Sequence, residues 1–408
     1  MSLFSIIGIL LTITALFSYL NNRYFRLPSA IGVMLIALIM SVAIMISDDL
    51  GLDFVVQARE MLNSMNFSQA VLSGMLSFML LAGALHTNLV DLKKEKWIVG
   101  LLATAGVILS TVLIGFGSHY VLQLMGMPLP LLYCFAFGAL ISPTDPIAVL
   151  AILKGLKISK SLESKIAGEA LFNDGVGVVA FTVFLGLALD RTTLTMFDIA
   201  FMLARQVIGG VALGLIMGWV TSALMERANE AQVKIMLTLG LAAGGYALAT
   251  SLGTSGPIAI VAAGLVVGSQ RRKLRQNVDE PGTIESFWEI IDGILNAVLF
   301  VWIGLYLLIL PLEVHEVVAG VFIIVVVLAG RFVSVSAILQ FFAAHRRMQP
   351  RIRRILTWGG VRGGVSIALA LSIQHSGASE IIVSVTYVVV AFSVLVQGLT
   401  FKKLVAGI

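Results

Sequence analysis

The feature that most constrains this chain is a series of apolar runs, each long enough to cross a lipid bilayer. A transmembrane helix needs about 20 predominantly apolar residues. Only 12% of the 408 residues are charged, whereas a typical soluble domain has about 25%. The sequence therefore predicts an all-α polytopic membrane protein with about thirteen spans and no separate soluble domain. The spans are expected near residues 3–20, 28–46, 67–86, 97–118, 131–153, 163–189, 197–225, 232–252, 256–270, 286–310, 314–343, 355–374 and 379–400.

The basic residues support this arrangement of spans and give it an orientation. When the loops are taken alternately, one set contains 22 of the 27 Lys and Arg residues, and the other contains only Arg59 and Arg191. Cytoplasmic loops of membrane proteins are enriched in Lys and Arg. We therefore expect an extracellular N-terminus and a cytoplasmic C-terminus. The net charge of +5 is explained by these loops, and we expect no binding of nucleic acid.

Thirteen spans can be divided into six, a linker and six. We expect a first repeat over residues 1–189, a linker helix over 190–231 and a second repeat of inverted topology over 232–408. Inverted repeats are the usual architecture of secondary transporters, in which interrupted helices meet near the bilayer midplane. This division places the fifth and twelfth spans in corresponding positions.

The fifth and twelfth spans both carry helix-breaking residues. The fifth contains Pro143 and Pro146, which remove backbone donors, and the twelfth contains four glycines within residues 358–366. We therefore expect both helices to be interrupted and to cross at the midplane. The alternative is an ordinary proline kink and a glycine packing face.

Three polar residues lie within a few positions of one another in the sixth span. Glu169 and Asn173 are one helical turn apart on the same face, and Asp174 lies beside Asn173. Acids inside a membrane are costly and mark ion or proton pathways. The alternative for Glu169 is a structural ion pair, because Arg331 and Arg362 also lie within predicted spans and either could neutralise it.

The deep acids outnumber the deep bases that could pair with them. The predicted spans contain three deep acids, Asp145, Glu169 and Asp174, but only two deep bases near them, Arg331 and Arg362. At least one carboxylate is therefore expected to have no fixed cation. Such a buried carboxylate takes up a proton or binds a mobile cation. A group that holds the two ligands in turn has the elementary property of a cation/proton exchanger.

Oxygen ligands for a hard cation are available in the fifth and sixth spans. Asp174, the amide oxygen of Asn173 and the hydroxyl and carbonyl of Thr144 form a candidate Na⁺ site. Asp145 adds a carboxylate where the interruption frees backbone carbonyls. We expect no resident cofactor, because the cations and protons are the transported substrates and no His/Cys cluster is present for a transition metal.

A second acidic group is predicted at the cytoplasmic start of the tenth span. Glu285, Glu289 and Asp292 could form a negatively charged entry funnel for cations. Alternatively, they complement the dipole at the N-terminus of that helix.

Six segments resemble, in order and spacing, the cation/proton antiporter-1 family, which includes the bacterial NhaP-type sodium/proton antiporters. The resemblance extends from about residue 70 to the end of the chain. It implies an NhaA-like antiporter fold and exchange of Na⁺, and Li⁺, for H⁺. The segments are "SPTDPIAV" (142–149), "GEALFNDGVGVV" (168–179), "SGPIAIVAAGLVVG" (255–268), "FWEIIDGILNAVLFVWIGL" (287–305), "GRFVSV" (330–335) and "WGGVRGGVSIALALSI" (358–373).

The resemblance also implies roles for the residues of the candidate site. Asp174 matches the aspartate that carries the ion and the proton, and Thr144 matches a cation-coordinating position. Asn173 stands where electrogenic relatives have a second aspartate, so that exchange is expected to be electroneutral, one cation for one proton. Relatives are homodimers that work by alternating access, and a bacterial inner membrane is the expected location.

Three further positions match residues that stabilise the family fold. Asp145 matches an acid that offsets nearby helix ends, and Arg362 matches the arginine of the glycine-rich interrupted helix. Glu169 matches a glutamate that pairs with an arginine, here Arg331. Two positions depart from the family pattern. Residues 78–89 lack the glutamate found in many relatives, so its role is absent or taken over by another residue. Ala170 replaces a frequent serine and removes one possible oxygen ligand, which leaves the cation preference open.

There are three alternatives to Na⁺/H⁺ exchange. A K⁺/H⁺ antiporter of the same fold differs in cavity size, which one sequence does not reveal. A passive channel needs a continuous polar lining, whereas the polar residues here cluster at one depth. An intramembrane hydrolase needs Ser with His or Lys, or paired catalytic aspartates, and no protease-type motif accompanies Asp145 and Asp174. The sequence therefore predicts a transporter and no enzyme.

Overall fold

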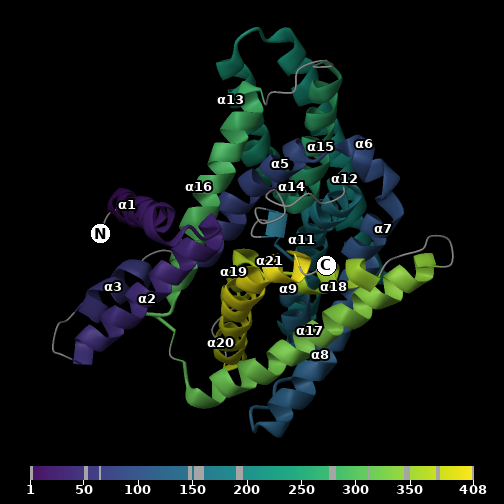
Figure 1. The fold of residues 1–408 in the computed structure, drawn as a ribbon. Coiled ribbons are helices and arrows are strands. Elements are labelled where there is room, and N and C mark those ends of the chain that lie inside the picture. Colours follow the sequence, from purple (N-terminus) through teal and green to yellow (C-terminus); the bar gives the residue numbers. More distant parts are fainter. Residues whose placement is uncertain are drawn as a thin grey trace.

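The structure is a computed structural model that describes most of the chain as a bundle of helices (Figure 1). The described residues contain helices and connecting segments but no strand, which confirms the all-α prediction. They are residues 3–49, 54–63, 66–145, 149–150, 160–189, 196–274, 282–310, 312–343, 350–373 and 377–406.

Four of the long helices in the described part of the chain contain a π-helical turn, labelled η, that joins two α-helical parts, and η1 instead ends the first helix at Phe25. The elements of the first half are α1 (Leu3–Leu20), η1 (Asn21–Phe25), α2 (Ser29–Asp49), α3 (Phe54–Asn63), α4 (Phe67–Gln69), η2 (Ala70–Met75), α5 (Leu76–His86), α6 (Leu89–Lys94), α7 (Lys96–Leu101), η3 (Leu102–Gly106), α8 (Val107–Leu124), α9 (Leu131–Ile141) and α11 (Lys160–Leu189). Those of the second half are α12 (Met196–Arg227), α13 (Ala231–Gly240), η4 (Leu241–Gly245), α14 (Tyr246–Ser251), α15 (Gly256–Leu274), α16 (Thr283–Tyr306), α17 (Val314–Ala343), α18 (Pro350–Trp358), α19 (Gly364–Leu371), α20 (Gly377–Phe392), η5 (Ser393–Gln397) and α21 (Gly398–Ala406).

Ten helices in the described part of the chain are long and apolar enough to cross a membrane. The remaining predicted spans lie where helices are short, interrupted or charged at one end. The helix α9 has 11 residues, the predicted twelfth span is divided into α18 and α19, and α15 ends in a basic segment. The protein is therefore a multi-pass membrane protein, and the number thirteen and the division into repeats stay predictions.

The predicted interruptions are present at both places. The helix α9 ends at Ile141, because Pro143 has no backbone donor and restricts the residue before it. Residues 359–363, which include three of the four glycines, separate α18 from α19. The N–H of Asp145 donates to the carbonyl oxygen of Val361 over 2.7 Å. This bond joins the two interruptions directly.

The helix α11 packs tightly against the first interruption. A Cβ atom added at Gly177 would lie 2.1 Å from Cγ of Pro143, so only glycine allows this approach. The large apolar core surrounds the crossing and includes the fully buried Leu140, Phe300 and Phe401. The two interruptions and the polar part of α11 are therefore held together inside the bundle.

Candidate cation and proton site

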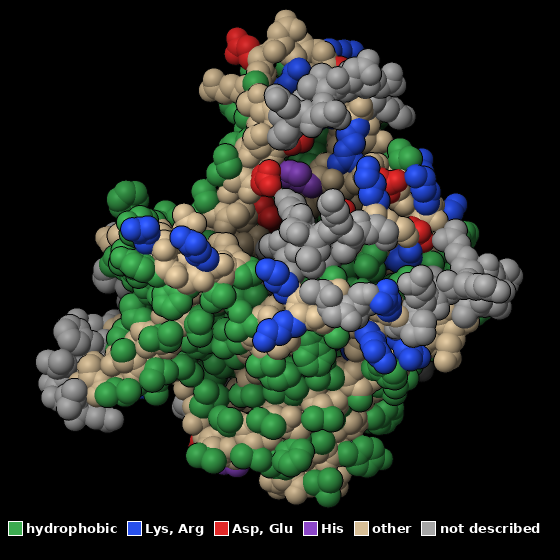
Figure 2. All heavy atoms as spheres, viewed as in Figure 1, with side chains coloured by type: hydrophobic (Ala, Val, Ile, Leu, Met, Phe, Trp, Pro, Cys, Tyr) green, Lys and Arg blue, Asp and Glu red, His purple; other side chains and the backbone are tan. Residues whose placement is uncertain are grey.

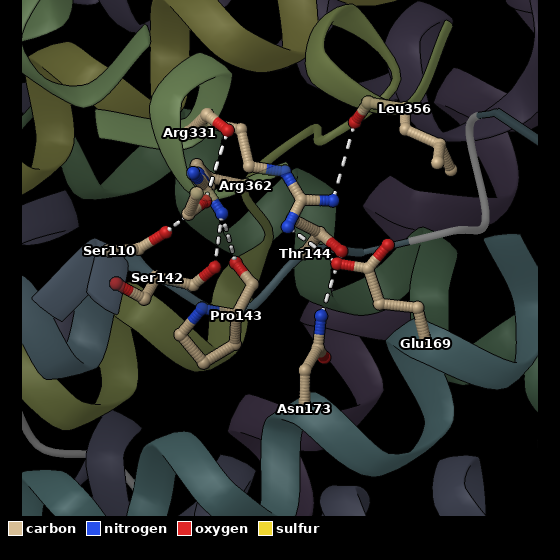
Figure 3. Close-up of polar contacts among 10 residues, drawn as sticks. Ser110, Ser142, Pro143, Thr144, Glu169, Asn173, Arg331, Leu356 and Arg362 are labelled. Carbon is tan, nitrogen blue, oxygen red and sulfur yellow. Dashed lines mark hydrogen bonds and ion pairs between the residues drawn. The ribbon is translucent and has the colours of Figure 1, made fainter. Parts of the chain in front are cut away.

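Asn173 connects α11 to the interruption that follows α9. Its side chain is fully buried, and Nδ2 donates a hydrogen bond of 2.9 Å to Oγ1 of Thr144 (Figure 3). Its Oδ1 is also buried and has no hydrogen-bond partner among the described residues. A buried oxygen without a donor is costly, and it is the kind of ligand that a hard cation prefers.

Asp174 follows Asn173 on α11 and is half-buried. Its carboxylate forms no hydrogen bond or ion pair with the described residues, although the charge of Asp145 acts on it. The carboxylates of Asp174 on α11 and Asp145 in the interruption after α9 would repel each other if both were ionised. A proton or a mobile cation on Asp174 would relieve that repulsion.

Asp145 lies at the start of α19. A Cβ atom added at Gly363 would be 2.5 Å from Oδ2 of Asp145, so the carboxylate rests directly on this glycine. Gly363 is the residue that precedes the first turn of α19. The N-terminus of a helix carries a partial positive charge, which a carboxylate in this place compensates.

Arg362 performs the opposite role at the end of α9. Its buried guanidinium donates through Nη1 to the carbonyl oxygen of Ser142 and to that of Pro143, the second bond measuring 2.9 Å (Figure 3). These carbonyls have lost their helical donors because α9 stops there. An arginine beside them compensates the partial negative charge of a helix C-terminus.

Glu169 is held by Arg331. The distance between Oε1 of Glu169 and Nη1 of Arg331 is 2.5 Å, and both side chains are buried. Arg331 also donates from Nη2 to the carbonyl oxygen of Leu356 at 3.3 Å, which fixes α17 to α18. The sequence left Glu169 open to either of two arginines, and the structure pairs it with the one that the family resemblance indicated.

Four of the five charged residues at the crossing compensate one another or a helix end. Arg331 pairs with Glu169, Arg362 compensates the end of α9, and Asp145 compensates the start of α19. In the described part of the chain, Asp174 is the deep carboxylate without such a fixed partner. The arrangement can hold one mobile cation or one proton beside the oxygens of Asn173 and Thr144.

Sequence reasoning missed the groups that hold the second interruption in place. The N–H of Arg362 donates to Oγ of Ser393 at 2.9 Å, and that hydroxyl donates to Oε1 of Gln397. Nε2 of Gln397 in turn donates to the carbonyl oxygen of Trp358 at 3.1 Å. Ser and Gln in an apolar helix were the available signal, but nothing in the sequence gave their partners.

The predicted funnel residues lie on the first three turns of α16, and each of them takes part in an interaction. Oε2 of Glu285 lies 3.3 Å from Nη2 of Arg271 on α15. Asp292 accepts a hydrogen bond of 3.0 Å from Asn296, and Glu289 is exposed. The ion pair to Arg271 ties Glu285 to α15, so a role in cation entry stays a prediction for this group.

Known proteins with similar sequences are sodium/proton antiporters. Residues 9–407 match the model of a family described as "Sodium/hydrogen exchanger, transmembrane". The chain is 42% identical over 408 residues to the Na⁺/H⁺ antiporter NhaP of Pseudomonas aeruginosa, covering 99% of this chain and 96% of that protein. It is 30% identical over 390 residues to the Na⁺/H⁺ antiporter NhaH of Halobacillus aidingensis, covering 93% and 91%.

A solved structure shows the same fold. The sodium proton antiporter MjNhaP1 from Methanocaldococcus jannaschii, determined at pH 8, matches with a TM-score of 0.77 at 18% sequence identity. The match covers 100% of this chain and 99% of that one, which confirms the predicted antiporter fold. The sequence match and the fold together show that the chain belongs to the family of transmembrane sodium/hydrogen exchangers, which are multi-pass membrane transporters and not enzymes.

Proposed function

We propose that this protein exchanges Na⁺, and Li⁺, for H⁺, with the cation and the proton competing for Asp174. One observation carries the proposal: Asp174 has no fixed partner among the described residues, while Glu169, five residues before it on α11, is neutralised by Arg331 at 2.5 Å. The relatives named above are called Na⁺/H⁺ antiporters, which supports the same cargo here. The cation is substrate, and no resident cofactor is proposed.

The proposed Na⁺ site consists of the carboxylate of Asp174, Oδ1 of Asn173 and an oxygen of Thr144. Two features support it: Oδ1 of Asn173 is buried without a donor, and Asn173 and Thr144 are already joined at 2.9 Å. Asn173 is neutral and cannot carry a second proton. One titrating carboxylate exchanges one cation for one proton, so the cycle is electroneutral.

The surroundings of the site are proposed from the sequence and the family. The protein resides in a bacterial plasma membrane, with the N-terminus outside and the C-terminus in the cytoplasm. Residues 1–189 and 232–408 form the inverted repeats on either side of the linker helix. The protein is a homodimer that works by alternating access of the crossing to the two sides of the membrane.

Proteoliposomes test the proposed exchange. The vesicles have an acidic interior and contain a pH dye, and Na⁺, Li⁺ or K⁺ is added outside. Alkalinisation by Na⁺ and Li⁺, unchanged when valinomycin and K⁺ clamp the voltage, is the expected result. An equal response to K⁺ identifies a K⁺/H⁺ antiporter instead, and a response that depends on the voltage clamp contradicts electroneutrality.

Asp174→Asn tests the assigned residue. The variant should lose exchange and keep its melting temperature within a few degrees, because the side chain has almost the same volume and breaks no ion pair. Glu226→Gln, which removes an exposed acid on α12, is a control for removal of a negative charge. Cation-driven proton flux in purified Asp174→Asn would remove Asp174 from the mechanism.

A further inference from the structure

The helix α18 has a strongly basic outer side. Its sequence PRIRRILTW contains three arginines in nine residues and no acid. Arg351 and Arg354 are exposed and one turn apart, whereas Ile355 and Leu356 are buried. Residues three apart lie on the same face of a helix, so the two exposed arginines act together.

The third arginine of α18 stands over an apolar surface. The guanidinium carbon of Arg353 is 5.0 Å from the ring centroid of Phe332 on α17. Phe332 is 42% exposed and lies in a helix that is long and apolar enough to cross a membrane, so we expect its ring to face lipid. Nε of Arg353 has no hydrogen-bond partner among the described residues. Arg353 therefore combines a charged guanidinium with an adjacent exposed ring, which suits a ligand that has both a polar headgroup and apolar chains.

The helix α21 extends the basic surface. Lys402 and Lys403 are exposed, and α21 also contains no acid. Nε1 of Trp358 at the end of α18 donates to Oγ1 of Thr400 at 3.0 Å, which holds the two helices together. Figure 2 shows Lys and Arg side chains gathered around the place where α18 and α21 lie in Figure 1. We call this surface the basic platform; its members are Arg351, Arg353, Arg354, Lys402 and Lys403.

The basic platform has no charge partner in the described part of the chain, because none of its five side chains forms an ion pair with a described carboxylate. Five uncompensated cations repel one another unless an anion lies between them. Arginine recognises a phosphate with paired donors in one plane. The exposed ring of Phe332 beside Arg353 suits an acyl chain, which free phosphate lacks.

We propose that the basic platform binds the phosphate of an anionic phospholipid in the cytoplasmic leaflet. The inference rests on the proposed orientation, which puts the loop before α18 and the C-terminus on the cytoplasmic side. Basic residues close to the cytoplasmic end of a span attract anionic lipids. The basic platform also lies beside the exposed ring of Phe332. The arginines and lysines would hold the headgroup of the lipid, and the ring would contact its acyl chains.

Hydrogen bonds connect the basic platform to the crossing. Trp358, which ends α18, accepts from Gln397 at 3.1 Å, and Gln397 accepts from Ser393. Ser393 accepts from the N–H of Arg362 at 2.9 Å, and Arg362 holds the end of α9. A lipid that fixes α18 on α21 therefore stabilises the crossing of the interrupted helices and, with it, the site.

The binding experiment uses the purified protein in a neutral detergent. Dioleoyl phosphatidylglycerol should raise the melting temperature, whereas dioleoyl phosphatidylcholine and inorganic phosphate at the same concentration should leave it unchanged. Each basic residue near the membrane surface contributes about a fivefold gain in affinity for anionic lipid. Arg351→Gln combined with Arg354→Gln should raise the lipid concentration at half-maximal stabilisation about 25-fold.

The matched control removes two exposed basic residues of other predicted cytoplasmic loops, as Lys93→Gln combined with Arg227→Gln. This variant should respond to phosphatidylglycerol like the wild type. Equal weakening in both double variants means that only the total charge attracts the lipid, and the site is wrong. Stabilisation by phosphatidylcholine or by inorganic phosphate alone also overturns the proposal.

A transport measurement in lipid vesicles distinguishes failure of this inference from failure of the proposed function. In vesicles of phosphatidylcholine, added phosphatidylglycerol should accelerate exchange by the wild type and the control variant, and should accelerate the platform variant much less. Equal acceleration of all three contradicts the lipid site and leaves Na⁺/H⁺ exchange intact. Absence of exchange in every vesicle refutes the proposed function, while the melting experiment still decides lipid binding.

Discussion

Asn173 donates a hydrogen bond of 2.9 Å to the hydroxyl of Thr144, and this bond joins α11 to the interruption after α9. Both side chains are buried. The two residues belong to segments 29 positions apart, and each supplies an oxygen to the proposed cation site. The bond therefore sets the spacing of two proposed ligands before the cation arrives.

Thr144→Val tests this bond. Valine has nearly the same shape but leaves Nδ2 of Asn173 buried without an acceptor, which costs about 1–3 kcal/mol. We expect a lower melting temperature and a higher KM for Na⁺. Thr144→Ser keeps the hydroxyl and should retain most of both properties. A valine variant with the stability and KM of the wild type would show that the bond has no part in the site.

We expect the Glu169–Arg331 ion pair to stabilise the fold. Glu169→Gln or Arg331→Gln alone leaves a buried charge without its partner, which costs about 3–5 kcal/mol. The double variant should be more stable than either single variant, because no unpaired charge remains. Thermal unfolding of the three variants measures this difference.

The control for this cycle is Arg205→Gln on α12. Arg205 is exposed and donates one hydrogen bond to the carbonyl oxygen of Leu252 at 2.9 Å, so its loss should lower the melting temperature much less. If Glu169→Gln and Arg331→Gln both have the melting temperature of the wild type, the buried pair does not stabilise the fold.

The interruptions and the residues of α11 could be predicted from the sequence because their causes are local. Pro143 removes a donor, and the glycines at 359 and 360 weaken the helix wherever it lies. The one-turn spacing of Glu169 and Asn173 follows from helix geometry alone. These features need no knowledge of how distant helices pack.

The partners of the charged residues could not be predicted by the same means. Which arginine meets Glu169 depends on the rotation and depth of α17 against α11, and periodicity gives neither. The same applies to Glu285, which reaches Arg271 on another helix, and to Ser393, which accepts from the backbone of Arg362. Contacts of this kind are set by tertiary packing.

Gly177→Ala is expected to disturb the crossing. The added methyl group would lie 2.1 Å from Cγ of Pro143, so α11 must move away from the interruption that contributes Thr144. Exchange should fall at least tenfold, and the melting temperature should decrease. Gly186 on the same helix has no atom within 4 Å of an added Cβ and provides the matched control.

Gly186→Ala should leave exchange unchanged and slightly stabilise the protein, because alanine favours a helix by about 1 kcal/mol over glycine. The comparison of the two variants separates crowding at the crossing from the general effect of a methyl group on α11. Equal activity of both would mean that α11 can shift without consequence for the site.

The pH dependence of the cation affinity follows from competition at one carboxylate. If Na⁺ and H⁺ bind Asp174 in turn, each proton bound must leave before a cation can bind. The KM for Na⁺ should therefore rise as the pH falls, up to tenfold for each pH unit in the range where the protonated form predominates, while the maximal rate at saturating Na⁺ changes less. Exchange measured at several Na⁺ concentrations and pH values gives both quantities. A KM that is constant while only the maximal rate changes would place the controlling proton on another group.

Arg362 provides the last test, because its role is electrostatic as well as structural. Its guanidinium lies against the carbonyl oxygens of Ser142 and Pro143, where α9 ends with a partial negative charge. Arg362→Gln keeps a donor but loses the charge, and exchange should fall roughly tenfold or more, since compensation of a partly buried helix end is worth up to about 2 kcal/mol. Arg362→Lys keeps the charge and should retain more exchange than the glutamine variant. If the two variants are equally impaired, the paired donors of the guanidinium matter and its charge does not.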